Sequence, residues 1–243
     1  MKMDKKIEQA LTGLLQKYDV KADRGLNLMP GWNFIGKELL DSDVPLLCWR
    51  HNRKFIELKN LVSNNVIEHV CMLRFCSFGS KEQSSLESLI YKELDLCEFL
   101  GQGKVISMHS VISDGLAGNI IVKLDNGIIG SVEVGAQVPE GSPYTDRHEI
   151  IARRGVASDL SVDTQVPQSS VYTYTTEGKH SYKDVDNELF GFDENSISQI
   201  RAAFDVQKNP GQVEELRSQH SHLSLLVKTA IKSNLKQQKI EVK

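Results

Sequence analysis

The chain has 243 residues, of which 40% are hydrophobic and 25% charged, with a formal net charge of −3. This length suits one large or two small domains, and the small negative charge gives no electrostatic case for binding nucleic acid. No apolar run reaches the roughly 18 residues of a membrane span, and the N-terminal MKMDKKIEQALTGLL is too polar for a secretory signal. We therefore expect a cytoplasmic protein with no membrane partner, whose four cysteines are free, buried thiols.

The first half of the chain alternates helical and extended patterns. The predicted elements are a helix at 4–18, a loop with short turns at 24–45, a buried strand at 45–50, a helix at 54–65, a strand at 66–77 and a helix at 81–100. In the last of these helices, apolar residues recur every three or four positions, and Gly101 ends it.

Strand patterns dominate from residue 104 onward. A strand at 104–112 precedes a hairpin in which two apolar-rich runs flank Asn126-Gly127, a pair typical of a type I′ turn with φ > 0 at both central residues. Two further hairpins are predicted, one with Gly155 and one with Gly178 in the turn. Helices at about 195–206 and 212–235 and a short KIEV strand complete the pattern. The order favours an α+β fold with a mainly antiparallel open sheet and helices packed on one face.

Several strings, in this order, resemble the C-terminal domain of the Gfo/Idh/MocA family of NAD(P)-dependent sugar oxidoreductases. The strings are WRHNRKF at 49–55, ELKNLVSNNVIEHVCMLRF at 57–75, DLCEFLG at 95–101, LDNGIIGSVEVG at 124–135, IIARRGVASDL at 150–160 and SHLSLLVKTAIKSNLKQQKIEV at 221–242. The resemblance implies an irregular N-terminal segment at 1–44 with a helix and no Rossmann domain, followed by an α+β domain at 45–243. It also implies that the sheet binds substrate and builds a homo-oligomer.

The chain departs from the family pattern in its cofactor motifs. No G-x-G-x-x-G turn occurs, although such a turn is needed to bring backbone against a pyrophosphate, and the family's E-K-P motif is missing. We expect no cofactor in this chain; NAD(P) would be bound only if another chain supplied a Rossmann domain.

A second departure lies in the helix at 81–100, where active family members carry an aspartate and a histidine four residues apart. The resemblance places these positions at Ser88 and Lys92. Serine does not replace a carboxylate, and lysine is a poor base at neutral pH unless it is desolvated. We therefore assign no catalytic residue with certainty.

The resemblance also nominates substrate-binding residues, and the sequence contains no HExxH, zinc or EF-hand spacing that would predict a metal site. The candidate substrate-binding residues are Arg50, Asn52, Arg53, Lys92, Tyr144, Arg147 and His148. An arginine here could bind a sugar carboxylate or phosphate, or form a structural ion pair.

Three hypotheses follow. The first is a non-catalytic relative of the oxidoreductase substrate domain that binds a sugar-type ligand or assembles through its sheet. The second is an oxidoreductase subunit whose Rossmann domain comes from a partner chain. The third is an unrelated α+β interaction protein.

Overall fold

The computed structural model describes residues 3–159, 170–176, 178–183 and 188–242. The chain divides into two compact units. The first unit comprises Met1–Arg53 and Val185–Ser224, and the sheet unit comprises Lys54–Asp184 and Leu225–Lys243. The predicted division at residue 44 is an assignment by family resemblance and stays a prediction.

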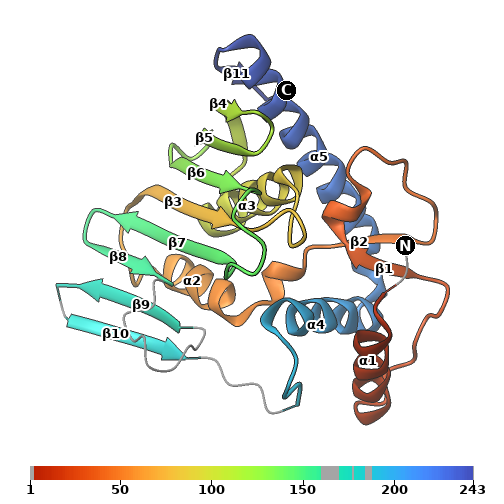
Figure 1. The fold of residues 1–243 in the computed structure, drawn as a ribbon. Coiled ribbons are helices and arrows are strands. Elements are labelled where there is room, and N and C mark those ends of the chain that lie inside the picture. Colours follow the sequence, from red (N-terminus) through yellow and green to blue (C-terminus); the bar gives the residue numbers. More distant parts are fainter. Residues whose placement is uncertain (1–2, 160–169, 177, 184–187, 243) are drawn as a thin grey trace. The chain divides into compact units, whose positions relative to one another are not determined.

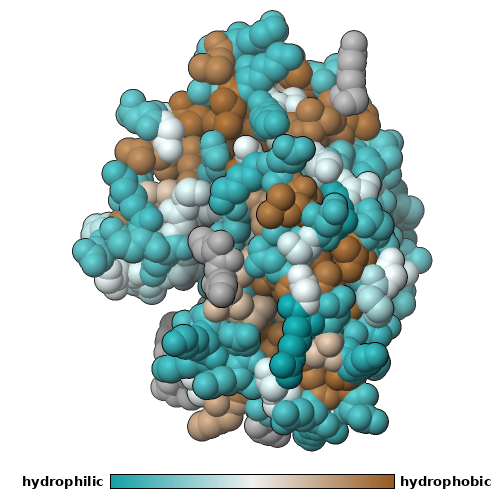
Figure 2. Space-filling model, turned by 90° about the vertical axis from the view of Figure 1, so that its right-hand side faces the viewer, coloured by the Kyte–Doolittle hydropathy of each residue, from teal (hydrophilic) through white to brown (hydrophobic). Residues whose placement is uncertain are grey.

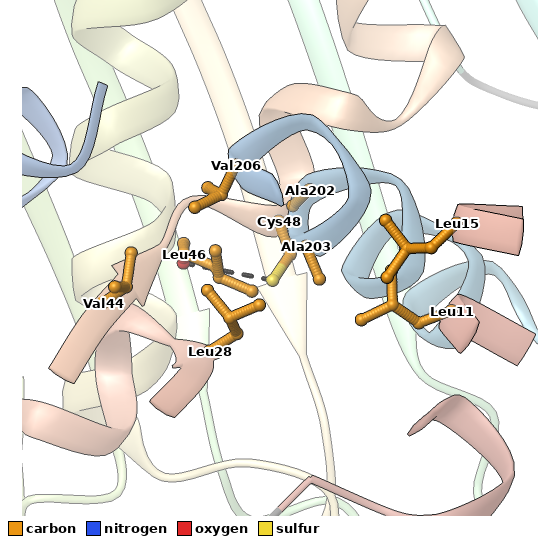
Figure 3. Packing of buried hydrophobic residues seen from close by; sticks show 9 residues of the cluster. All are labelled: Leu11, Leu15, Leu28, Val44, Leu46, Cys48, Ala202, Ala203 and Val206. Atoms are coloured by element: carbon orange, nitrogen blue, oxygen red, sulfur yellow. Dashed lines mark hydrogen bonds between the residues drawn. The ribbon is translucent and has the colours of Figure 1, made fainter. Parts of the chain in front are cut away.

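The first unit is a small helical assembly around a two-stranded parallel sheet. Its elements are α1 (Lys5–Lys17), β1 (Asn27–Pro30), η1 (Gly31–Phe34), β2 (Asp43–Leu46), η2 (Cys48–His51), α4 (Glu194–Lys208), η3 (Pro210–Gln212) and the first half of α5 (Val213–Lys236). Figure 3 shows its core, in which side chains of α1, β1, β2 and α4 converge around Cys48. Leu46 and Ala203 there are almost fully buried.

Two predictions for this region are wrong. The loop predicted at 24–45 contains β1 and η1, and the strand predicted at 45–50 is β2 followed by the 3-10 helix η2. Each strand has only four residues, so no alternation develops in the sequence. The two strands pair in parallel along their backbones, and a side-chain bond adds to this, since Asn27 Nδ2 donates to Asp43 Oδ1 at 2.7 Å.

The sheet unit contains one large sheet, which Figure 1 shows with α2 and α3 behind it. Its elements are α2 (Arg53–Ser63), β3 (Val70–Phe78), α3 (Leu86–Gly101), β4 (Val105–Ser113), β5 (Ala117–Leu124), β6 (Ile129–Gly135), β7 (Thr145–Ala152), β8 (Gly155–Ser158), β9 (Ser170–Thr175), β10 (Gly178–Lys183), the end of α5 and β11 (Ile240–Glu241). The strand order is β10-β9-β8-β7-β3-β6-β5-β4-β11, and among these described strands β3–β6 is the single parallel pair. The predicted α+β class and mainly antiparallel open sheet are thus confirmed.

Helices cover one face of this sheet. Phe55 of α2 and Glu93 of α3 both contact the side chain of His148 on β7, so the two helices share a face. Gly130 of β6 lets α3 approach closely, because a Cβ there would lie 3.1 Å from Cys97 Sγ and 2.6 Å from a Val122 methyl group. The other face carries exposed side chains, as an antiparallel sheet allows.

The predicted hairpins form, with three corrections to their turns. Gly178 lies in β10 opposite Thr175 rather than in the turn. Gly127 has a φ of 91°, but Asn126 does not share the positive φ that a type I′ turn requires. The Asn126 side chain instead contacts the end of α3, where its Nδ2 donates to the Gly101 carbonyl at 2.7 Å. Gly155 lies in β8 opposite Ala152 rather than in the turn, and its missing Cβ would meet a β9 carbonyl oxygen at 2.8 Å.

On the face shown in Figure 2, hydrophilic side chains predominate and hydrophobic ones lie between them in small groups. Among the described helices, none combines the length and apolar character needed to cross a membrane.

The β4 edge of the sheet is closed by the chain's own C-terminal segment. β11 pairs with Met108 and Ser107, and beyond it α5 supplies side-chain acceptors to the backbone. The Ser110 N–H donates to Ser233 Oγ at 3.0 Å, and the Ile112 N–H donates to Asn234 Oδ1 at 2.7 Å. These bonds occupy donors that would otherwise template pairing with another chain.

We expect Asn234→Ala to lower the free energy of unfolding by about 1 kcal/mol, because the Ile112 N–H loses its acceptor. It should also speed aggregation, measured by light scattering on mild heating, since the strand edge becomes available. Asn60→Ala, an exposed position on α2, is the control and should change neither quantity. Equal behaviour of the two variants would contradict the edge-protection role.

Candidate functional site

Helix α3 begins with a reciprocal pair of serines. Ser85 Oγ accepts from the Ser88 N–H at 3.1 Å, Ser88 Oγ accepts from the Ser85 N–H at 3.0 Å, and the Ser88 hydroxyl lies 2.7 Å from the Ser85 carbonyl oxygen. This capping box satisfies two of the orphan donors of the first helical turn. The Ser88 side chain is therefore engaged in capping the N-terminus of its own helix.

Strand β7 directs Asp146 and His148 to the helix-covered face, because residues two apart on a strand share a side. His148 is fully buried, whereas Arg147 between them is exposed on the opposite face. β7 thereby brings a carboxylate and an imidazole against α2 and α3.

Two lysines from the helices bind Asp146 from both sides. Lys92 Nζ lies 2.6 Å from Asp146 Oδ1 and 3.3 Å from Glu93 Oε1. Lys54 Nζ lies 3.0 Å from Asp146 Oδ2 and 3.2 Å from Asp159 Oδ2. The side chains of both lysines are at most 10% exposed, so these are buried ion pairs.

His148 bridges the other two carboxylates of the cluster. Its Nδ1 lies 2.8 Å from Asp159 Oδ2, and its Nε2 lies 3.0 Å from Glu93 Oε2. A carboxylate accepts but does not donate, so both ring nitrogens must carry protons for both bonds to form. With Asp159 and Glu93 both ionised, the two contacts therefore fit an imidazolium.

The electrostatics agree with this protonation state. Burial acts to lower the pKa of His148, but the charges of Asp146, Asp159 and Glu93 outweigh it and raise that pKa to about 9. Burial likewise opposes the charge on Lys92, yet Asp146, Tyr144 and Glu93 raise its pKa well above the usual value. Burial would raise the pKa of Asp146, and Lys54, Lys92 and His148 instead hold it well below its usual range.

Aromatic rings line the cluster. The His148 ring meets Phe55 and Phe75 edge to face, with centroids 4.6 Å and 4.9 Å apart. Lys92 Nζ lies 5.5 Å from the centroid of the Tyr144 ring, and the Tyr144 hydroxyl is 2.6 Å from Ser77 Oγ. These rings keep bulk water from most of the charges, which strengthens each ion pair.

Within the described part of the chain, Glu93, Asp146 and His148 each offer a metal-ligand atom, and these atoms lie within 4.8 Å of one another. The Lys92 ammonium already lies between the two carboxylates, and both His148 nitrogens face carboxylates rather than offering a lone pair. This donor set fits an internal cation better than a metal ion.

The structure brings together three of the sequence-predicted residues, Lys92, Tyr144 and His148. Arg50 and Asn52 lie in the first unit, where Arg50 Nη1 donates to Gln219 and Asn52 Nδ2 donates to Glu194. Arg53 is exposed at the start of α2, and Arg147 is exposed on the open face of the sheet.

Sequence reasoning did not select Lys54, Glu93 or Asp159. Two signals were available. Glu93 interrupts the apolar stripe of α3, and Asp146 precedes His148 by two residues on a predicted strand. Lys54 and Asp159 carry no local signal, because only tertiary contacts place them here.

A groove of about 700 Å³ also runs along α1 in the first unit. Its ionisable lining residues, Lys6, Lys17 and Glu188, are exposed, and Lys17 pairs with Glu188 at 2.5 Å. The hydrogen bond to Glu188 raises the pKa of Lys17, but no ionisable lining residue is buried, so the groove lacks the desolvated charges of the β7 cluster.

No protein-family profile matches the chain, and no curated protein sequence does. Solved structures do match its fold. An oxidoreductase from Agrobacterium radiobacter in complex with NAD+, L-tartaric acid and magnesium has a TM-score of 0.64 at 12% identity, over 82% of this chain and 64% of that one. Levoglucosan dehydrogenase in complex with NADH and levoglucosan has a TM-score of 0.63 at 12% identity, over 81% and 65%. An inositol dehydrogenase homolog from Azotobacter vinelandii in complex with NADH and myo-inositol has a TM-score of 0.58 at 9% identity, over 82% and 64%.

The chain thus has an oxidoreductase-like fold and spans about 64% of the length of these structures. The resemblance to Gfo/Idh/MocA-type oxidoreductases is confirmed at the level of the fold.

The charge on His148 makes the stability of the protein depend on pH. The folded-state pKa of about 9 lies above the ordinary 6.5, so the stabilisation is fully present below pH 6.5 and is lost as the pH rises through about 9. It amounts to roughly 3 kcal/mol. Urea unfolding across this pH range should show the loss.

His148→Gln is the matched variant, because it keeps a polar side chain but removes the titration. It should be less stable than the wild type at pH 6.5 and show a flatter dependence of unfolding free energy on pH. If the variant's unfolding free energy falls with pH as steeply as that of the wild type, another group is responsible for the titration.

Proposed function

We propose that this chain is a non-catalytic relative of the substrate-binding part of the sugar oxidoreductases, which self-associates through the open face of its sheet. One observation carries the first half of the proposal. The Lys92 amine, at the position where the resemblance places a catalytic histidine, is a buried ammonium paired with Asp146 and Glu93.

A general base must offer a lone pair to the hydroxyl proton that leaves during hydride transfer. Lys92 offers none at neutral pH, because its pKa is raised well above the usual value. Ser88, at the position of the aspartate, has its hydroxyl engaged in the helix cap and carries no charge. Both halves of the expected catalytic pair are therefore engaged in structural contacts.

The open face of the sheet supports the second half of the proposal. Val111, Ile121 and Ile129 are exposed by 54%, 50% and 46% on neighbouring strands, beside the Arg74–Glu149 ion pair. Apolar side chains grouped with charges of both signs suit a two-fold contact, in which each patch meets its own copy. A second copy of the chain is the proposed partner.

A sugar-type ligand and a cytoplasmic setting belong to the same proposal. The fold neighbours include sugar dehydrogenases by their names. The four free cysteines, of which Cys71 is exposed and Cys76 partly so, suit a reducing compartment. The expectation that all four are buried is wrong for these two, which lie on β3.

The first test is turnover. Purified protein mixed with NAD+ or NADP+ and either myo-inositol or levoglucosan should produce no reduced nicotinamide above the rate without protein. Levoglucosan dehydrogenase is the positive control. Steady turnover that Lys92→Ala abolishes would overturn the non-catalytic assignment.

The second test is self-association. We expect the wild type to have a dimer or larger mass by light scattering, and Ile121→Lys to shift it toward the monomer. Leu235→Lys is the control, because Leu235 is 78% exposed but lies on α5. A monomeric wild type at high protein concentration would contradict the sheet-face proposal.

The alternative is an NAD(P)-dependent oxidoreductase subunit whose dinucleotide-binding domain comes from another chain. The NAD+ and NADH named for the fold neighbours favour it. A stable complex with such a chain that binds NAD(P) and turns over a sugar would support this alternative over our proposal.

A further inference from the structure

The buried charges at β7 balance only when Asp146 is counted. Lys54, Lys92 and the His148 imidazolium carry three positive charges, and Glu93 and Asp159 carry two negative ones. Without Asp146, these groups would hold one unbalanced positive charge away from water, which is costly. The five remaining groups thus require one more carboxylate.

Asp146 supplies that carboxylate in the manner of a bound ligand. Each of its oxygens meets a different ammonium, Oδ1 with Lys92 at 2.6 Å and Oδ2 with Lys54 at 3.0 Å. Ser77 Oγ lies 3.3 Å from Oδ1 and His148 Nε2 lies 3.6 Å from it. These contacts would serve the carboxylate of a small molecule equally well.

Asp146 is also the most accessible of the three carboxylates. Its side chain is 16% exposed, compared with 0% for Glu93 and 2% for Asp159. It lies at the solvent side of the cluster, near the partly exposed Tyr144. A carboxylate arriving from solvent would therefore reach the position of Asp146 before that of either other acid.

We propose that Lys54 and Lys92 form a carboxylate-binding site that Asp146 fills from within the chain. The inference rests on the proposed function in one respect, since it takes Lys92 as a binding cation and not as a base. The ligand class is a small organic acid, such as a sugar acid, whose carboxylate replaces that of Asp146. A neutral polyol offers no such charge.

The internal carboxylate has a high effective concentration, so a free acid competes with it poorly in the wild type. Removing the Asp146 side chain both vacates the site and leaves the positive charge unbalanced. Affinity for a small carboxylate should then rise at least tenfold.

The test is chemical rescue of Asp146→Ala, followed by thermal unfolding. The variant should melt well below the wild type, and sodium acetate or sodium gluconate should raise its midpoint by about 3 °C or more over sodium chloride at equal ionic strength. Sorbitol is an uncharged polyol of similar size to gluconate. It should raise the unfolding midpoint of the variant by no more than it raises that of the wild type. Asp159→Ala is the control: it removes an equally paired acid that is 2% exposed, so acetate should not rescue it.

The double variant Asp146→Ala with Lys92→Met should lose the rescue, because the vacated site lacks one cation. Rescue that is absent in Asp146→Ala, or equal in Asp159→Ala, would overturn the proposal. If Asp146→Ala does not fold in chloride, its refolding yield in acetate against chloride gives the same comparison. None of these readouts involves nicotinamide turnover, so their failure is separate from failure of the proposed function.

Discussion

The sheet unit depends on charge balance within a space that excludes most water. Three cations and three carboxylates from α2, α3, β7 and the end of β8 lie within direct contact of one another. Loss of one partner would leave a buried charge uncompensated, at a cost of about 3–5 kcal/mol. The cluster therefore fixes how α2 and α3 sit on β7 and which protonation states the buried groups adopt.

This charge balance affects the role of Lys92 on α3. The family resemblance places an aspartate and a histidine of a catalytic pair at Ser88 and Lys92 of α3. In this chain the same surface holds a lysine whose charge the cluster needs. Our proposal therefore treats Lys92 as a structural cation, because an amine that stays protonated to stabilise the fold is a poor proton acceptor.

The sheet itself obeys two simpler constraints. On its helix-covered face, Gly130 leaves room for α3 to pack closely at Cys97. At its β4 edge, Ser233 and Asn234 accept from backbone N–H groups that could otherwise pair with another chain. Among the described residues, no helix covers the open face. Its exposed apolar side chains form the surface on which we propose that a second copy packs.

The sequence by itself determined the α+β class, the mainly antiparallel hairpins and the apolar stripe of α3, because these follow from periodicity and turn residues within short windows. It also located Lys92, Tyr144 and His148 among the candidates. Strands of four residues, such as β1, were too short to show a period.

Only the tertiary structure decided the chemistry of the site. Lys54 and Asp159 are 105 positions apart in the chain, yet both contact the same cluster because α2 and the end of β8 meet there. Whether a lysine is a base or a structural cation depends on charges brought from distant segments. Local sequence carries no record of those charges, since Coulomb interactions depend on distance in space and not on position along the chain.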